Sequence, residues 1–284
     1  MNLAIIIDST CDLGADELKS LKVQSVPLYV NFQGKMHRDW LDITPAAIIK
    51  GVSEGADLPT TSQPSPEDFA RAYAAAEAAG ADTILVITIT SELSGTFQSA
   101  NIAKERAKAA VHVFDSRAAS LGHGEMARTA ARLRDAGASI DQILDALKVI
   151  RDTNFVIFTV GTMEYLQKGG RIGRASAFLG GLLNIKPILT LEDGKIAPLS
   201  RARGVRKAQQ EMVDRFKAYA ANLGGSPVVN LIHIQDESAA IGMRQALVDS
   251  GVQFQLAGVH EIGAVIGSHV GPATFGLYAH KAVG

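Results

Sequence analysis

Serine and threonine side chains flank a glycine at the point where a predicted strand gives way to a predicted helix. The apolar run 84–89 is typical of a buried parallel strand, and Ser94, Gly95 and Thr96 lie between it and a helix that continues past Asn101. The first N–H groups of a helix have no intrahelical partner and carry partial positive charge, so they favour an anion. We interpret this turn as an anion-binding site, and an ordinary helix N-cap is the alternative that stays open.

Other hydroxyl groups and one histidine lie elsewhere in the chain without a general base in the same motif. Thr61 and Ser62 belong to the proline-rich segment 59–66, and His269 belongs to the glycine-rich segment 267–272. Hydroxyl and helix N–H groups are neutral donors that suit a carboxylate or phosphate, whereas acid–base turnover needs a placed titratable group. These residue types therefore indicate that an anion is held rather than converted.

Sequence motifs of common enzyme classes fit this chain poorly. The segment 51–55 has the spacing of a nucleophile elbow, but a predicted helix precedes it where that motif needs a strand. The segment 122–127 resembles a dinucleotide fingerprint but lies eight residues beyond its strand. No Walker-type phosphate loop is present, and the seven histidines and one cysteine show no metal-ligand spacing. We therefore expect neither a metal nor a cofactor.

Two groups of cations and one apolar segment are further candidates. Arg171 follows two glycines, which predicts a cation on a mobile turn, with a solvated arginine as the alternative. A second group gathers near the start of a later helix, where cations oppose the helix dipole and mildly indicate an acidic partner: Arg201, Arg203, Arg206 and Lys207. The segment 175–183 predicts a thin apolar helix that leaves room beside it, with close packing on a sheet as the alternative.

Strands and helices alternate through the first half of the chain, which predicts a parallel sheet with helices on both faces. Asp8 and Asp115 each begin an Asp-Ser pair after a strand, so we expect two parallel strands to deliver polar turns to one edge. The predicted strands are 3–7, 26–32, 84–89 and 111–114. The predicted helices are about 14–21, 46–52, 66–79, 96–108, 118–136 and 140–151.

The pattern changes after residue 155. Asp193-Gly194 lies between the apolar runs 188–191 and 196–199 and is the strongest hairpin signal in the chain. Hairpins beside helices predict an α+β domain with a partly antiparallel sheet. We place the boundary near residue 150, which gives an α/β domain over 1–150 and an α+β domain over 151–284. The remaining predicted elements are helices near 162–168, 204–222 and 238–250 and strands at 155–160, 228–234, 252–259 and 274–279.

The composition excludes several broad classes of protein. A length of 284 residues suggests two domains, and a net charge of −1 gives no basic surface for nucleic acid. Cys11 is the only cysteine, which fits a reducing compartment. No run approaches the ~18 apolar residues of a membrane span, and the N-terminus lacks the basic and apolar regions of a signal peptide. We therefore expect a soluble, cytoplasmic protein.

Six segments, taken together in their order and spacing, resemble the DegV family over essentially the whole chain. They are Asp8–Thr10, Thr61–Ser65, Leu93–Ala100, Asp115–Arg117, Tyr165–Ile172 and His269–Pro272. The resemblance implies a two-domain protein that binds a fatty acid and serves as the lipid-presenting subunit of a bacterial fatty acid kinase. In that system a separate ATP-dependent kinase subunit phosphorylates the bound acyl carboxylate.

The resemblance also implies roles for individual residues. Thr61 and Ser94 match the residues that hold the carboxylate, and His269 matches the histidine that supports them. Arg171 matches an arginine implicated in handling the phosphorylated head group or the kinase. Ala273 is a departure, since the family often has glycine there, and it narrows the backbone freedom beside His269. Residues expected to support the carboxylate site are Ser62, Gly95 and Thr96, and those expected to meet phosphate or the partner include Arg201 and Arg203.

We therefore expect a carrier rather than an enzyme, with catalysis in a partner kinase. A long-chain fatty acid is expected between the two domains, with its acyl chain against Phe178, Leu179 and Leu182. Two alternatives remain: a stand-alone enzyme acting on a small anionic metabolite, and a lipid-storage protein without a kinase partner.

Overall fold

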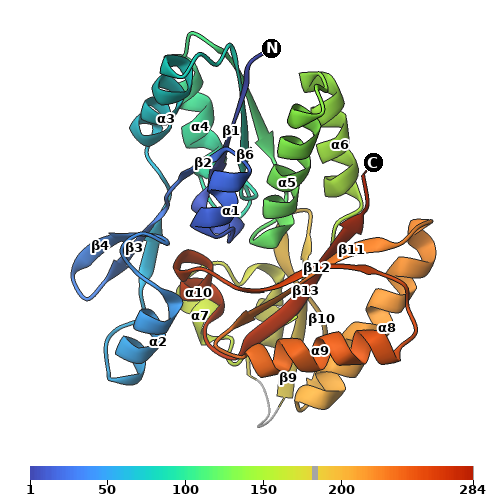
Figure 1. Cartoon of the computed structure of the whole chain (residues 1–284). Helices are drawn as coiled ribbons and strands as arrows, with labels where there is room; N and C mark the ends of the chain where they lie inside the picture. Colours follow the sequence, from blue (N-terminus) through green and yellow to red (C-terminus); the bar gives the residue numbers. More distant parts are fainter. Residues whose placement is uncertain (181–184, 284) are drawn as a thin grey trace.

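The computed structural model describes residues 1–180 and 185–283. A parallel sheet with its helices forms one end of the molecule, and a larger mixed sheet forms the other (Figure 1). Among the described residues the parallel sheet has the order β2-β1-β6-β7. Its strands are β1 (Leu3–Asp8), β2 (Val23–Val26), β6 (Thr83–Thr88) and β7 (Ala110–Asp115).

Each face of the parallel sheet packs against its own helices because successive side chains of a strand point to opposite faces. Ile6 and Val86 pack against α3 and α4, whereas Ile5 and Leu85 belong to the core that includes α5. The prediction of a parallel sheet with helices on both faces is confirmed. The helices of this part are α1 (Ala15–Ser20), α3 (Pro66–Ala78), α4 (Thr96–Lys104), α5 (Leu121–Asp135) and α6 (Ile140–Asp152), and η1 (Ser9–Cys11) is a short 3-10 turn.

The second sheet is mixed, in the order β10-β9-β8-β13-β11-β12 over the residues described. β11 and β12 are parallel and the other neighbours are antiparallel, so the predicted α+β part with a partly antiparallel sheet is confirmed. Asp193 and Gly194, with φ of 51° and 80°, close the β9–β10 hairpin in the left-handed geometry its tight turn needs. The strands are β8 (Phe155–Thr159), β9 (Ile185–Glu192), β10 (Lys195–Arg203), β11 (Pro227–Ile234), β12 (Gln255–Glu261) and β13 (Thr274–Lys281).

One apolar core passes from the first sheet to the second through α5. Met126 and Ala127 of α5 share a cluster of buried side chains with Ile5 of β1 and Val156 of β8. The boundary near residue 150 stays a prediction, and it falls within α6 beside this common core. The helices of the second part are α7 (Glu164–Lys168), α8 (Val205–Leu223), α9 (Glu237–Asp249) and α10 (Ala264–Val270). None of the helices in the described ranges is long and apolar enough to cross a bilayer.

The segment 26–32, predicted as one strand, divides at Pro27. Proline has no N–H to donate to a ladder, so β2 ends at Val26. The chain after it enters a small antiparallel sheet of order β4-β3-β5, in which the proline-rich segment 59–66 supplies an edge strand rather than a loop. Its strands are β3 (Tyr29–Phe32), β4 (Lys35–Arg38) and β5 (Thr60–Ser62), and α2 (Pro45–Ser53) lies between the last two.

The predicted helix over 175–183 is wrong where the structure describes it. A 3-10 turn, η2 (Gly173–Phe178), ends at Leu179, which is extended, and Gly180 has a φ of 88°. Leu182 lies outside the described residues. Two other differences concern the last part of the chain: α10 has no predicted counterpart, and β12 begins at Gln255 rather than Val252.

Candidate functional site

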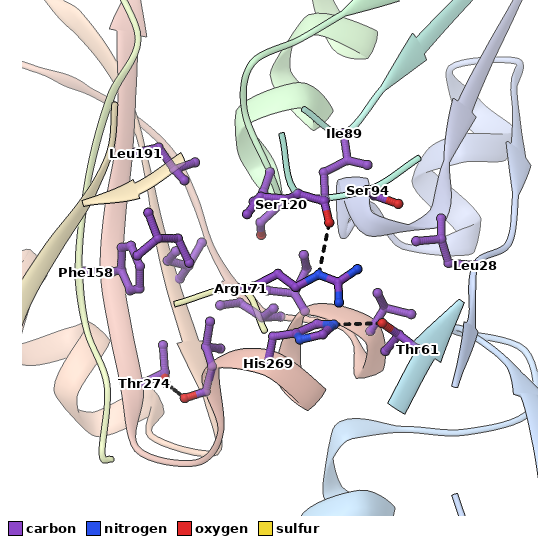
Figure 2. Close-up of a pocket in the computed structure, with 18 of the residues that line it drawn as sticks. Leu28, Thr61, Ile89, Ser94, Ser120, Phe158, Arg171, Leu191, His269 and Thr274 are labelled. Atoms are coloured by element: carbon purple, nitrogen blue, oxygen red, sulfur yellow. Dashed lines mark hydrogen bonds between the residues drawn. The ribbon is translucent and has the colours of Figure 1, made fainter. Parts of the chain in front are cut away.

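A cavity of about 340 Å³ lies between the two sheets, within the size range of small-molecule pockets. Figure 2 shows Phe158 and Leu191 on one side of it and Thr61 and Ser94 on the other. Most of its polar groups, including Thr61, Ser94, His269 and Arg171, gather at the second side, which we call the polar end. The rest of the wall is mostly apolar and includes Leu28, Ile89, Val156, Phe158, Leu191, Ile196, Ile232, Ile262, Val265, Ile266 and Val270.

Strand alternation and a buried carboxylate supply the apolar wall. On β8, Val156 and Phe158 face the cavity, while Ile157 between them packs into the core under α8. Ile89 follows β6, and its N–H donates to Oδ2 of the fully buried Asp8 at 2.6 Å. Asp8, from the first Asp-Ser pair, therefore fixes the backbone of a wall residue rather than facing the cavity itself.

Thr61 of β5 and His269 of α10 meet at the polar end. Thr61 Oγ1 lies 2.7 Å from His269 Nε2 (Figure 2). Within the described residues His269 Nδ1 has no hydrogen-bond partner, and it lies so close to Gly169 that a Cβ there would come within 2.4 Å. Because an unpaired acceptor is better tolerated than an unpaired buried N–H, the proton belongs on Nε2, which donates to Thr61. The Thr61 hydroxyl proton is then free for an anion.

The histidine is neutral at physiological pH. Burial, together with the positive charge of Arg171, lowers the pKa of His269 to about 4. A base this weak is poorly matched to proton abstraction near pH 7. Its role in this geometry is to orient the hydroxyl of Thr61.

Ser94 and Thr96 flank the start of α4, but neither caps it. The N-cap is Gly95, with no side-chain hydrogen bond, so the N-cap alternative for Ser94 is wrong. Ser94 lines the cavity and its Oγ lies 2.9 Å from Oγ1 of the fully buried Thr96. Gln63 covers Gly95 so closely that a Cβ there would lie 2.1 Å from its Oε1. Ser62 also lines the cavity, and the anion-binding role of the turn stays a prediction.

Arg171 reaches from the second part of the chain to the turn before α4. Its Nε donates to the Leu93 carbonyl at 3.1 Å and its Nη1 to the Gly169 carbonyl at 2.9 Å. The solvated-arginine alternative is therefore wrong. Backbone N–H groups of Gly169, Gly170 and Arg171 donate to carbonyls of α7, and the mobility expected for this turn stays a prediction. These two bonds use two of the five guanidinium donors, which leaves others for an anion in the cavity.

Four other candidates lie away from this cavity. Phe178 and Leu179 line a separate depression beside α7. The prediction that they line the cavity between the sheets is therefore wrong. That depression also contains Arg201, whose guanidinium carbon lies 4.5 Å from the centroid of the Phe178 ring. Arg203 is exposed on β10. The physical reason is the early end of η2 at Phe178, after which Leu179 is extended, so Phe178 and Leu179 do not lie on a helix beside the cavity.

Several cavity residues were not identified from the sequence. Gln63 is one, and its Nε2 donates to Ser99 Oγ at 3.1 Å, which ties β5 to α4. Its position inside the Thr61–Ser65 segment was the available signal. The apolar residues of α10 are others, and only the glycines at 263 and 271 mark that helix in the sequence.

The polar end can hold an anion with hydroxyl donors and one guanidinium. Two hydroxyls, a neutral imidazole and an arginine are suited to binding a carboxylate, because hydrogen bonds to charged groups are the strong ones. Across residues 1–180 and 185–283, no three histidine, cysteine, aspartate or glutamate side chains come together as a metal site needs.

Comparison with known proteins gives a family over nearly the full length. Residues 2–282 match the family model described as an uncharacterised protein of the DegV family. A DegV domain-containing protein from Deinococcus radiodurans is 40% identical over 277 residues, which cover 98% of each chain.

Solved structures agree with this match. A DegV family protein from Thermus thermophilus, described as fatty acid binding, is 45% identical with a TM-score of 0.95 and covers 99% of this chain and 100% of its own. A stearic-acid-binding protein from Eubacterium ventriosum is 28% identical with a TM-score of 0.90, and 98% of each chain is covered.

Proposed function

The chain belongs to the DegV family, and on that premise we propose that it binds one long-chain fatty acid in the cavity between its sheets and presents the carboxylate to a kinase. The observation that carries the proposal is the gathering of Thr61, Ser94, His269 and Arg171 at one end of a cavity whose remaining wall is mostly apolar. A molecule with a long apolar chain and one anionic group matches that division.

The apolar wall favours the tail. Each buried methylene contributes about 0.8 kcal/mol, so a dozen contribute roughly 10 kcal/mol before the unfavourable terms of association. The polar end then fixes the direction of the chain. Thr61 and Ser94 offer hydroxyl protons, and Arg171 offers charge, so the carboxylate is held at this end and the methyl end points toward Phe158 and Leu191.

The first test is the ligand content of the protein as purified. Mass spectrometry of an organic extract is expected to find about one long-chain fatty acid per chain, and the delipidated protein is expected to bind oleate in a titration. Little lipid and no oleate binding would exclude the carrier proposal and favour an enzyme acting on a small anion.

Presentation to a kinase is the finer part of the proposal. Arg171 lines the cavity at the polar end and retains donors after its two backbone contacts. Its planar guanidinium suits phosphate oxygens, and an acyl phosphate carries more charge than a carboxylate. We therefore assign Arg171 a larger role toward the phosphorylated product than toward the fatty acid.

The matching experiment compares two readouts in Arg171→Ala: oleate affinity, and acyl phosphate formation with a fatty acid kinase subunit and ATP. Acyl phosphate formation is expected to fall much more than affinity. Arg174→Ala is the control, because Arg174 is exposed and pairs with Glu192 outside the cavity. Oleate binding without any acyl phosphate from wild-type protein would instead support lipid storage.

A further inference from the structure

The helix that carries His269, α10, has no N-cap side chain of its own to bind the N–H groups of its first turn. α10 has seven residues, and its N-cap is Gly263, which has no side chain to accept from the first turn. A helix this short is unstable by itself, and its first N–H groups need acceptors from elsewhere. The position of α10 is therefore set by the groups to which it is bound.

Two aspartates from the first forty residues supply these acceptors. Asp12 Oδ1 accepts from the Gly263 N–H at 3.0 Å, and Asp39 Oδ1 accepts from the Val265 N–H at 3.2 Å. The two residues are 3% and 1% exposed. A Cβ on Gly263 would lie 2.7 Å from Asp12 Oδ1, so the glycine is what allows the carboxyl group to approach.

The second oxygen of each aspartate accepts from a serine of the first part of the chain. Asp12 Oδ2 accepts from the Ser120 hydroxyl, and Ser120 lines the cavity. Asp39 Oδ2 accepts from the Ser9 hydroxyl at 2.8 Å, and Ser9 Oγ accepts from the N–H of the wall residue Leu28 at 3.0 Å. Each aspartate thus connects α10 to a cavity wall from the first part of the chain.

Placing two carboxyl groups here is unfavourable for stability. Burial is the largest effect, raising the pKa of Asp39 to about 6 and that of Asp12 well above its ordinary range. In the described part of the chain, no lysine or arginine side chain bonds to either one. Apolar side chains in such places are often at least as stabilising. The pair contributes geometry instead, because a carboxylate can accept from several donors at once.

We propose that Asp12 and Asp39 are positioning residues for ligand binding, which hold α10 against the first part of the chain and so set His269 against Thr61. Val265 and His269 are four residues apart and lie on one face of α10, so fixing its first turn fixes the imidazole. This assignment rests on the proposed function, because the geometry that it sets is that of the carboxylate-binding end.

The test compares Asp39→Asn, Asp39→Ala and a matched control, Glu125→Gln. Asparagine keeps an acceptor for Val265 and gains a donor for Ser9, whereas alanine removes both contacts. Glu125 is another buried carboxylate, 5% exposed, that joins the two parts of the chain away from the cavity. Two readouts are taken: oleate affinity, and the ¹⁵N ring signals of His269 in ligand-free protein labelled on histidine, assigned with His269→Gln.

Asp39→Ala is expected to weaken oleate binding about tenfold or more and to shift the His269 signals. Asp39→Asn is expected to stay within about threefold of wild type with little shift, and its melting temperature should not fall, because a buried charge is removed. Glu125→Gln is expected to lower the melting temperature while leaving both readouts unchanged.

Two results would overturn the proposal. One is an unchanged His269 signal in Asp39→Ala, and the other is loss of affinity in proportion to stability in all three variants. A third variant, Asp12→Ala, keeps the test informative if Asp39→Ala does not fold, since it removes the contacts to Gly263 and Ser120 and is expected to shift the His269 signals as Asp39→Ala does. If wild-type protein binds no oleate, the proposed function fails, yet the ring signals still show whether the aspartates position His269.

Discussion

The hydroxyl of Ser94 is the group whose role the structure narrows most. Because Gly95 is the N-cap of α4, the Ser94 side chain is not needed to begin the helix. Its contact with Thr96 leaves one hydroxyl proton of the pair for a ligand, since each hydroxyl has a single proton and only one is used between them. A residue that faces the cavity and supports no backbone group is suited to a role in binding alone.

Ser94→Ala is therefore expected to weaken oleate binding roughly 10- to 100-fold, since a hydrogen bond to a charged group contributes about 1.5–3 kcal/mol. The melting temperature of the ligand-free protein should hardly change. Titration and thermal unfolding of the same samples measure both. Ser91→Ala is the control in the same loop, because the Ser91 hydroxyl donates to Asp115 outside the cavity. A loss of stability with intact affinity would return Ser94 to a structural role.

At the scale of elements, the polar end depends on the close approach of α7 and α10. Gly169 ends α7 with an ordinary helical φ of −72°, so alanine would meet no backbone strain there. Space is the obstacle, because a Cβ would come 2.4 Å from His269 Nδ1 and 2.8 Å from the Tyr165 carbonyl oxygen. The imidazole would have to move, and Thr61 would lose its partner.

Gly169→Ala should thus weaken oleate binding by about tenfold or more, in the range expected for loss of an oriented hydrogen bond to an anion. Gly225→Ala tests whether any glycine substitution has this effect, since its Cβ would meet no atom within 4 Å. Titration with oleate measures both variants. Equal oleate affinity in Gly169→Ala and Gly225→Ala would show that α10 can move to make room for the new methyl group without weakening ligand binding.

The elements differ in how far the sequence determines them locally. The β9–β10 hairpin was predictable because its turn needs two left-handed residues, and Asp193-Gly194 supplies them. The division at Pro27 was readable in the same way but was missed. α10 was not predictable from local pattern, since seven residues show too little periodicity and its first turn is held by Asp12 and Asp39 from far away in the chain.

The candidate site also divides into residues that the sequence identified and residues that it misplaced. Thr61, Ser94, Arg171 and His269 were candidates by residue type and position, the family resemblance gave them roles, and the structure brings all four to one cavity. Phe178 was misplaced because an apolar segment does not show by composition alone which way its backbone turns.

At the scale of the whole molecule, a buried polar cluster around Glu125 of α5 joins the two parts of the chain away from the cavity. Glu125 accepts from Asn230 of β11 at 2.7 Å and from Arg128, and it lies 3.5 Å from the ring of His280 of β13. Arg128 in turn binds Glu17 of α1. Burial alone would raise the pKa of Glu125, but the nearby His280 ring, the charge of Arg128 and the Asn230 amide lower it to about 2.

The sign of the pH effect follows from that lowered pKa. Glu125 should stabilise the fold fully above the ordinary glutamate value of about 4.3, and the stabilisation should be lost as pH falls from there toward 2. In denaturant unfolding, Glu125→Gln should be less stable by a few kcal/mol at pH 7 and should lose less stability than wild type on acidification. Parallel pH curves for the two proteins would contradict this. Asp145→Asn, at an exposed pair with Lys148, serves as the control.

The position of β13 has a consequence for synthesis of the protein. Of the strands described, β13 leaves the ribosome last, and it is central in the mixed sheet, between β8 and β11. Until Thr274–Lys281 has emerged, β8 and β11 face each other as open strand edges, and such edges invite pairing with other chains. The nascent protein thus passes through a stage in which the parallel sheet has all its strands while the mixed sheet still has the unpaired edges of β8 and β11. A premature stop before Thr274 should therefore yield aggregates rather than a smaller soluble protein.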